Sequence, residues 1–224
     1  MGKTRIVGQM KFMIDEEAEI FYGTTDGITM GQTYGSWAEI FNAVLDLGSV
    51  DDPNQLLPHI RKQLRRIPPN LPLPDMVPAW TKLAPLLKSI LPLEIPENEL
   101  TVTMTDQSRA ENLQLLLIRL LQTSVMPGSV IVLDDAHLFD TASWALTLAV
   151  SQQLKGVLIV VGLRPLKPPF PFEYQQITHC ENAHQINLTP LSPEDSVTLA
   201  KQFLGVDKIP RKFYKKSLIS SYSC

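Results

Sequence analysis

Three residues at the start of the chain and two in its middle have the side chains that phosphate and Mg²⁺ chemistry needs. Gly2, Lys3 and Thr4 match the last three letters of the phosphate-binding loop G-x-x-x-x-G-K-[ST], in which the lysine reaches phosphate oxygens and the hydroxyl binds Mg²⁺. The first glycine of that pattern and the strand before it would precede Met1. We therefore expect only the second half of the loop, and three letters alone are a weak signal.

The second candidate is a pair of acids that follows a run of apolar residues. Val130–Leu133 is the kind of stretch that forms a strand buried on both faces of a parallel sheet, and Asp134 and Asp135 come directly after it. Ligands of open α/β sheets bind at the carboxyl ends of the strands. Such a pair also occurs by chance in unrelated α/β proteins. Its interpretation as a Mg²⁺-nucleotide site therefore depends on residues 2–4 and on a later strand that leads to Arg164.

Hydrophobic periodicity indicates the elements that must position these residues. Two buried strands, 129–133 and 157–161, are separated by a helix over 142–154, which is the pattern of a right-handed parallel βαβ unit. The sequence therefore predicts an α/β fold with a parallel sheet flanked by helices. The other predicted elements are strands at 19–23 and 184–188 and helices at 3–17, 34–47, 111–122 and 192–204.

Residues 68–96 form a proline-rich insert that holds eight of the eighteen prolines of the chain. Long helices are implausible there, although short helical pieces at 79–82 and 86–90 remain compatible with the sequence. A solvated linker is the simpler interpretation, but the insert is also rich in Leu and Ile, which a linker would lack. We expect an ordered, irregular segment that packs on the domain.

Composition limits the classes of partner and compartment. The 224 residues carry a net charge of −3, whereas a nucleic-acid-binding domain usually presents a basic face. The longest apolar run, Val157–Leu163, has the length of a strand and is too short to span a bilayer. The two cysteines do not suggest a disulfide framework, and the start of the chain lacks the apolar core of a signal peptide. We expect a cytoplasmic protein that binds neither nucleic acid nor membrane.

Histidines at two places in the chain could also be metal ligands or ligand contacts. His179, Cys180 and His184 offer three metal-ligating side chains within six residues but no fourth partner, so we interpret them as part of a loop. His137 follows the acid pair. A histidine bonded to the backbone at a helix start and a histidine that contacts a nucleotide are both compatible with its position.

Six segments share motifs with one family: Gly2–Arg5, Tyr34–Ile40, Ala84–Leu87, Leu133–Trp144, Val161–Pro165 and Leu188–Ser192. On these segments the chain resembles the signal-transducing (STAND) branch of the AAA-like P-loop NTPases. More narrowly, it resembles the ATPase module that follows the cyclase domains in soluble adenylyl cyclase and its bacterial relatives. The resemblance covers roughly residues 2–204, and its most specific part is the Asp-Asp-x-His-x-x-Asp pattern that begins at Asp134.

The resemblance implies a P-loop NTPase-like sheet, ATP and Mg²⁺ as cofactors, and a role for each matching residue. Lys3 would contact the β- and γ-phosphates, and Thr4 would ligate Mg²⁺. Asp134 would lie near the metal, Asp135 near the attacking water, and Arg164 would be the sensor at the end of the next strand. The other interpretation of Arg164 is a surface residue before a proline-rich loop.

Three departures from the family pattern bear on these roles. The first strand of the sheet would lie before Met1 and would border 157–161, so we expect an exposed apolar edge to which a protein partner could pair. The glycine-proline sensor motif of the family's helical lid does not appear, and no cyclase catalytic domain is present. We expect an incomplete NTPase domain over 1–190, the start of the lid over 191–205 and a divergent, disordered tail over 206–224.

These observations predict a truncated ATP-binding module similar to the regulatory ATPase region of soluble adenylyl cyclase. The resemblance links such a module to cyclic-AMP signalling, without cyclase activity and with impaired ATP hydrolysis. The alternative is a non-enzymatic remnant or interaction module, the product of a degraded gene copy.

Overall fold

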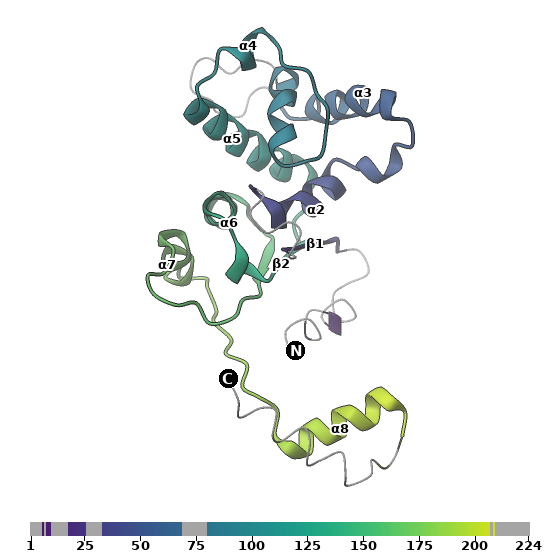
Figure 1. Cartoon of the computed structure of the whole chain (residues 1–224), viewed down its shortest axis with the longest axis vertical. Coiled ribbons are helices and arrows are strands. Elements are labelled where there is room, and N and C mark those ends of the chain that lie inside the picture. The colour runs from purple at the N-terminus through teal and green to yellow at the C-terminus, as the bar shows by residue number, and fades with distance from the viewer. Residues whose placement is uncertain are drawn as a thin grey trace. The chain divides into compact units, whose positions relative to one another are not determined.

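In the computed structural model, the described residues include a three-stranded parallel sheet (Figure 1). Its strands, in spatial order, are β1 (Ile20–Thr24), β2 (Val130–Asp134) and β3 (Leu158–Val161). Both strand pairs are parallel, and their register aligns Thr24 with Asp134 and Leu133 with Val161. The predicted α/β fold, with helices flanking a parallel sheet, is confirmed.

The structure describes residues 6, 8–9, 18–25, 33–68, 80–206 and 208. The chain divides into two compact units, Met1–His184 and Gln185–Cys224, and the sheet belongs to the first. The predicted helix over 3–17 and the predicted tail over 206–224 lie almost entirely outside the described residues.

Strand β2 lies in the middle of the sheet, and all five of its residues are buried. Successive side chains along a strand point to opposite faces. Residues on one face join the main hydrophobic core; they include Phe21, Ile131 and Leu133. Residues on the other face form a second, smaller cluster, made of Val130 and Val132 with Ile20, Tyr22 and Val160. By this alternation the side chain of Asp134 projects from the second face.

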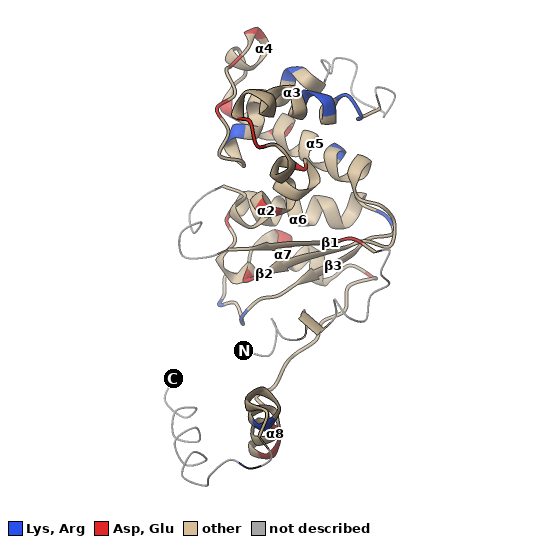
Figure 2. Ribbon diagram, turned by 90° about the vertical axis from the view of Figure 1, so that its right-hand side faces the viewer, with Lys and Arg blue, Asp and Glu red and all other residues tan. Residues whose placement is uncertain are grey.

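Helices cover the first face of the sheet, and α2 (Gly35–Val44) makes the closest approach. Helix α2 lies on β1 and β2, α6 (Thr141–Gln153) packs beside α2, and α5 (Asp106–Ser124) packs against both helices (Figure 2). A Cβ atom on Gly23 of β1 would overlap the backbone carbonyl oxygen of Ser36 in α2. Only glycine therefore permits this contact between strand and helix.

A second helical layer is built on η2 (Trp80–Ser89), a 3₁₀ helix that comes from the proline-rich insert. Its buried residues include Trp80 and Leu87. It runs through Pro85 as one element, whereas the sequence was compatible with two short helical pieces. Helices α3 (Pro53–Leu64), α4 (Glu99–Val102) and α5 pack against it. The described part of the insert, residues 80–96, is thus ordered and packed on the domain as predicted. Residues 69–79 lie outside the described residues.

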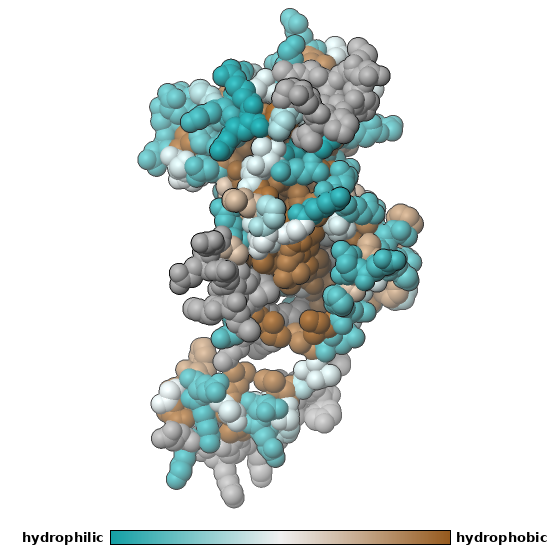
Figure 3. Space-filling view, turned by 180° about the vertical axis from the view of Figure 1, so that it is seen from behind, coloured by the Kyte–Doolittle hydropathy of each residue, from teal (hydrophilic) through white to brown (hydrophobic). Residues whose placement is uncertain are grey.

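Strand β3 is the edge strand of the described sheet, since among the described residues it pairs with β2 alone. Its first residue, Leu158, is 55% exposed, and the other three are partly exposed. The apolar edge predicted at 157–161 is thus present in the described part of the chain. Figure 3 shows apolar surface gathered in the middle of the face that it presents, with more hydrophilic side chains over much of the region above.

Two elements differ from the sequence-based expectation. The predicted strand at 184–188 is wrong, because these residues are exposed, have no regular structure and pair with no described strand. Helix α7 (Phe172–Thr178), which packs on α6, does not follow from the sequence, since it is short and lies among prolines. In the second unit, the helix predicted at 192–204 is confirmed as α8 (Pro193–Leu204), whose first turn is capped by the side chain of Ser192.

Candidate functional site

Asp134 is the last residue of β2, and its carboxylate is buried at the carboxyl edge of the sheet. The residue is 4% exposed. Its Oδ1 accepts a hydrogen bond from the backbone N–H of Asp135 at 2.8 Å, and its Oδ2 accepts one from the hydroxyl of Tyr22 at 3.3 Å. The structure thus places Asp134 where the sequence predicts it, with both carboxylate oxygens in hydrogen bonds.

Asp135 lies at the turn that follows β2. Its φ of 53° is in the left-handed region, which an aspartate tolerates better than most residues. This turn leads into η3 (Ala136–Leu138), and it is fixed to the next strand because the N–H of Ala136 donates to the carbonyl oxygen of Gly162 at 2.8 Å. The side chain of Asp135 is 38% exposed, so its carboxylate is open to solvent at the same edge of the sheet as Asp134.

The imidazole of His137 lies beside the carboxylate of Asp135. The two side chains are 3.6 Å apart, between Oδ1 of Asp135 and Nδ1 of His137. Nδ1 is buried and, within the described residues, has no hydrogen-bond partner. The sequence left two alternatives for His137, a bond to the backbone and a contact with a nucleotide. Among the described residues, Nδ1 of His137 makes no bond to the backbone.

Gly162 follows β3 and lies against the Asp134 carboxylate. Its N–H donates to the carbonyl oxygen of Leu133 at 2.8 Å, which extends the pairing of β3 with β2 by one residue. A Cβ atom at position 162 would lie 2.5 Å from Oδ1 of Asp134, closer than real Cβ contacts allow. The absence of a side chain here leaves room for the carboxylate.

Arg164 lies two residues beyond Gly162, and its side chain is exposed. No hydrogen bond or ion pair joins it to any residue that the structure describes. The structure therefore brings Asp134 and Asp135 together but does not bring Arg164 into contact with them. Gly2, Lys3 and Thr4, the other predicted site residues, lie outside the described residues.

Asp140 fixes a loop at the same edge of the sheet. Its Oδ1 accepts from the N–H of Ser143 at 2.5 Å and so caps α6, while its Oδ2 accepts from the N–H of Tyr34 at 2.7 Å. Tyr34 is buried, has a φ of 61° and comes directly before α2. The Asp140 carboxylate therefore joins the starts of α2 and α6, which are about a hundred residues apart in the sequence. Asp140, the last residue of the Asp-Asp-x-His-x-x-Asp pattern, thus has a structural role.

Two tyrosines of this region were not predicted from the sequence as site residues. Burial, together with the nearby Asp134 carboxylate, raises the pKa of the Tyr22 phenol. Burial and the charge of Asp140 raise the pKa of Tyr34 in the same way. Both phenols are therefore protonated at neutral pH, and Tyr22 can act as a hydrogen-bond donor to Asp134. The sequence indicates that Tyr22 belongs to a strand, because apolar residues partly alternate along β1. It does not indicate which residue of another strand lies beside the Tyr22 side chain.

The cluster of His179, Cys180 and His184 shows local bonds in place of metal-site geometry. Nδ1 of His179 lies 2.6 Å from the carbonyl oxygen of Gln175, and the thiol of Cys180 donates to the carbonyl oxygen of Gln176 at 3.3 Å. Among the described residues, no group of three or more His, Cys, Asp or Glu side chains could hold a metal ion. These contacts belong to the carboxyl end of α7.

The oxygen donors at the carboxyl edge of the sheet suit Mg²⁺. This ion prefers oxygen ligands and is usually held by one or two carboxylates, with waters and phosphate oxygens completing its shell. Asp134 and Asp135 supply carboxylates, and the edge is the position at which open parallel sheets bind ligands. The arrangement therefore suits a metal ion that is shared with a phosphate-bearing ligand.

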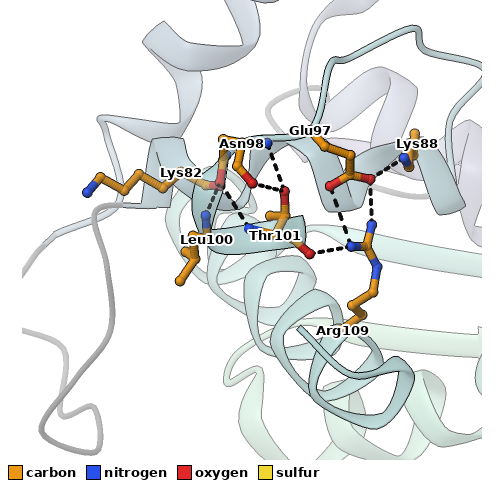
Figure 4. Close-up of polar contacts among 7 residues, drawn as sticks. All are labelled: Lys82, Lys88, Glu97, Asn98, Leu100, Thr101 and Arg109. Carbon is orange, nitrogen blue, oxygen red and sulfur yellow. Dashed lines mark hydrogen bonds and ion pairs between the residues drawn. The ribbon is translucent and has the colours of Figure 1, made fainter. Parts of the chain in front are cut away.

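A separate charged cluster holds the end of the proline-rich insert in the helical layer (Figure 4). Nη2 of Arg109 donates to Oε1 of Glu97 at 2.7 Å, and Lys88 forms an ion pair with the same oxygen. Nη1 of Arg109 also donates to the carbonyl oxygen of Thr101 at 2.6 Å. The hydrogen bonds from Arg109, Lys88 and Thr101 lower the pKa of Glu97 to about 2. The cluster links η2, α4 and α5 and is a structural feature of this layer.

Comparison with known proteins identifies a family for the chain. A family model described as the AAA ATPase domain matches residues 1–161 of the chain. The matched range contains residues 2–4, Asp134 and Asp135, and it ends with the last residue of β3. No curated protein and no solved structure matches the chain. None of the helices in the described part of the chain has the length and apolar character needed to cross a bilayer.

Proposed function

Because the chain belongs to the AAA ATPase domain family, we propose that it binds ATP together with Mg²⁺ at the carboxyl edge of its parallel sheet. Membership of this family of P-loop NTPases implies nucleotide binding and usually Mg²⁺ binding. The observation that carries the proposal is the buried Asp134 carboxylate at the end of the central strand, beside the more exposed Asp135. Two acids at this position are what a Mg²⁺-nucleotide site needs.

The roles that we assign follow from this placement. Asp134 would contribute to the metal site, and Asp135 would lie on the solvent side, near the attacking water. Gly2, Lys3 and Thr4 would complete the site as the phosphate-binding segment, with the ammonium of Lys3 neutralising phosphate charge and the hydroxyl of Thr4 as a metal ligand. When bound, Mg²⁺ would offset negative charge that develops on the phosphate oxygens.

We further propose that hydrolysis is impaired and that the module serves regulation. The exposed side chain of Arg164, which forms no hydrogen bond or ion pair with any described residue, supports weak hydrolysis because nothing in the described part of the chain holds this sensor toward the site. The resemblance to the ATPase module of soluble adenylyl cyclase supports a link to cyclic-AMP signalling, without cyclase activity. In this proposal residues 1–190 are the NTPase domain, 191–205 the start of the lid and 206–224 a divergent tail.

The proposal is tested by calorimetric titration of the chain with ATP in the presence and absence of Mg²⁺, alongside a phosphate-release assay. We expect Mg²⁺-dependent binding with little phosphate release. Replacing a charge-assisted contact costs about 1.5–3 kcal/mol, so Lys3→Ala should weaken binding roughly tenfold to a hundredfold. Lys62→Ala, on the surface of α3, is the matched control and should bind as the unmodified chain does. Equal binding by Lys3→Ala and the unmodified chain would contradict the assignment of the loop.

The alternative of an interaction module is favoured by one observation, the exposed side chain of Leu158 on the edge strand β3. An unpaired edge can accept a strand from a second copy of the chain. Analytical ultracentrifugation at increasing protein concentration measures whether two copies of the chain associate. Association that Leu158→Lys abolishes would support the alternative, and a monomer at every concentration would remove its support.

A further inference from the structure

Three groups lie close to the oxygens of the Asp134 carboxylate. The backbone N–H of Asp135 donates to Oδ1 at 2.8 Å, and the hydroxyl of Tyr22 donates to Oδ2 at 3.3 Å. Gly162 lies against Oδ1 from the side of β3. The residue is 4% exposed, so these neighbours and the sheet leave the carboxylate little room to change rotamer.

The position of Tyr22 follows from the register of the sheet. Tyr22 is aligned with Val132, and Asp134 is aligned with Thr24. Tyr22 is therefore the diagonal neighbour of Asp134 on the second face of the sheet, at a separation that a long side chain can bridge. Its ring belongs to the apolar cluster of Val130 and Val132, which holds it in place while its hydroxyl reaches Oδ2.

Gly162 affects Asp134 because it has no side chain, which leaves space for Oδ1 of the carboxylate. Its backbone is fixed on two sides, because its N–H donates to Leu133 and its carbonyl oxygen accepts from Ala136, each at 2.8 Å. The backbone therefore cannot move away to admit a side chain. With any Cβ atom 2.5 Å from Oδ1 of Asp134, the carboxylate itself would have to rotate.

From this geometry we infer that Tyr22 and Gly162 are positioning residues that hold the Asp134 carboxylate in one rotamer and so set the Mg²⁺ affinity of the edge. The inference rests on the proposed function, in which Asp134 contributes to the metal site. Tyr22 supplies a donor that orients Oδ2, and Gly162 supplies the space for Oδ1. Groups that orient a metal ligand in this way change metal affinity roughly tenfold to a hundredfold when they are replaced.

The experiment measures how ATP binding depends on the concentration of Mg²⁺, by calorimetry on the full chain. Tyr22→Phe and Gly162→Ala are compared with the matched controls Tyr174→Phe and Gly48→Ala. Tyr174 lies on α7 and packs on Trp144, and a Cβ atom at position 48 would have no atom within 4 Å. We expect both site variants to need roughly tenfold more Mg²⁺ for half-maximal binding. ATP binding without Mg²⁺ should be unchanged, which a general loss of structure would not produce.

The outcomes separate this inference from the proposed function. If the unmodified chain binds no Mg²⁺-ATP, the proposed function is wrong. If it binds, and the Mg²⁺ requirement of Tyr22→Phe equals that of Tyr174→Phe, the positioning role is wrong while the proposed function stands. Should Gly162→Ala fail to fold, Tyr22→Phe still decides, because it removes only a hydroxyl group.

Discussion

Asp140 is a residue whose two carboxylate oxygens have two different structural partners. One oxygen caps α6 at Ser143, and the other accepts the N–H of Tyr34 before α2. Replacing a capping aspartate with alanine costs about 1 kcal/mol, and losing a second charged bond costs about 1.5–3 kcal/mol more. We therefore expect Asp140→Ala to lower the free energy of unfolding by roughly 2.5–4 kcal/mol in urea titrations.

Two further variants give that prediction its control. Asp140→Asn keeps one acceptor oxygen, so its free energy of unfolding should fall by about half as much as that of Asp140→Ala. Asp51→Ala removes an exposed acid that has no hydrogen bond among the described residues, so it should change stability by less than about 0.5 kcal/mol. Equal stability of Asp140→Ala and Asp51→Ala would mean that neither the cap at Ser143 nor the bond to Tyr34 contributes to the free energy of unfolding.

The acid pair could be predicted from the sequence, because a run of buried apolar residues followed by polar ones identifies the carboxyl end of a central strand. The neighbours of Asp134 could not be predicted. Tyr22 lies 112 residues earlier in the chain, and its contact with Asp134 depends on which strands are adjacent and in what register. Gly162 belongs to the Val161–Pro165 motif of the sequence, but its role is steric and depends on the position of β3 beside β2.

At the scale of elements, the contact of β1 with α2 depends on a single glycine. A Cβ atom on Gly23 would overlap the backbone of Ser36 and lie 3.1 Å from Cδ1 of Ile40. Backbone cannot yield as a flexible side chain can, and overpacking of this kind costs about 1–3 kcal/mol or more. We expect Gly23→Ala to lower the melting temperature markedly and to loosen the packing of α2 on the sheet.

Gly48→Ala is the matched control for that change. A Cβ atom there would meet no atom within 4 Å, and Gly48 has no positive φ. It should leave the melting temperature unchanged or raise it slightly, by limiting the unfolded chain. If both alanine variants melt alike, α2 leaves room for a Cβ atom on Gly23, and the overlap with Ser36 does not occur in the folded chain.

The elements that the sequence predicted well are those with strong periodicity and clear boundaries. Helix α8 is an example, since Ser192 and Pro193 mark its start and Gly205 follows its last residue. The strand expected at 184–188 has alternating residues, but alternation makes a strand only where a neighbouring strand accepts its hydrogen bonds. Short elements such as α7 have too few residues for a period to be read, and their position is set by packing on α6.

At the scale of the first unit, the cluster around Glu97 should make stability depend on pH. The pKa of Glu97 falls from 4.5 to about 2 on folding, so the unfolded chain binds the proton more tightly. The ionised Glu97 carboxylate therefore makes its full contribution to the free energy of unfolding above pH 4.5, and this contribution is lost as the pH falls through about 2. Because the group is partly exposed, we expect Glu97→Gln to cost only about 1 kcal/mol at pH 7.

Urea unfolding at pH 7 and pH 3 checks this expectation. The difference in unfolding free energy between the unmodified chain and Glu97→Gln should be smaller at pH 3 than at pH 7. Glu99→Gln, whose exposed side chain accepts no hydrogen bond among the described residues, serves as the control. A difference that stays the same at both pH values would show that the ion pairs of Glu97 do not couple its protonation to folding.

The central claim is that the carboxyl edge of the sheet binds a metal-nucleotide complex, and paramagnetic NMR tests it most directly. Mn²⁺ replaces Mg²⁺ and broadens the amide signals of nearby residues, so titration with Mn²⁺-ATP reports where the metal lies. We predict selective broadening of Asp134, Asp135, Ala136 and Gly162, with α4 unaffected and with Mg²⁺-ATP reversing the effect. Broadening confined to other acidic surfaces, or none at ATP concentrations that saturate other ATPases of the family, would contradict a nucleotide site at this edge.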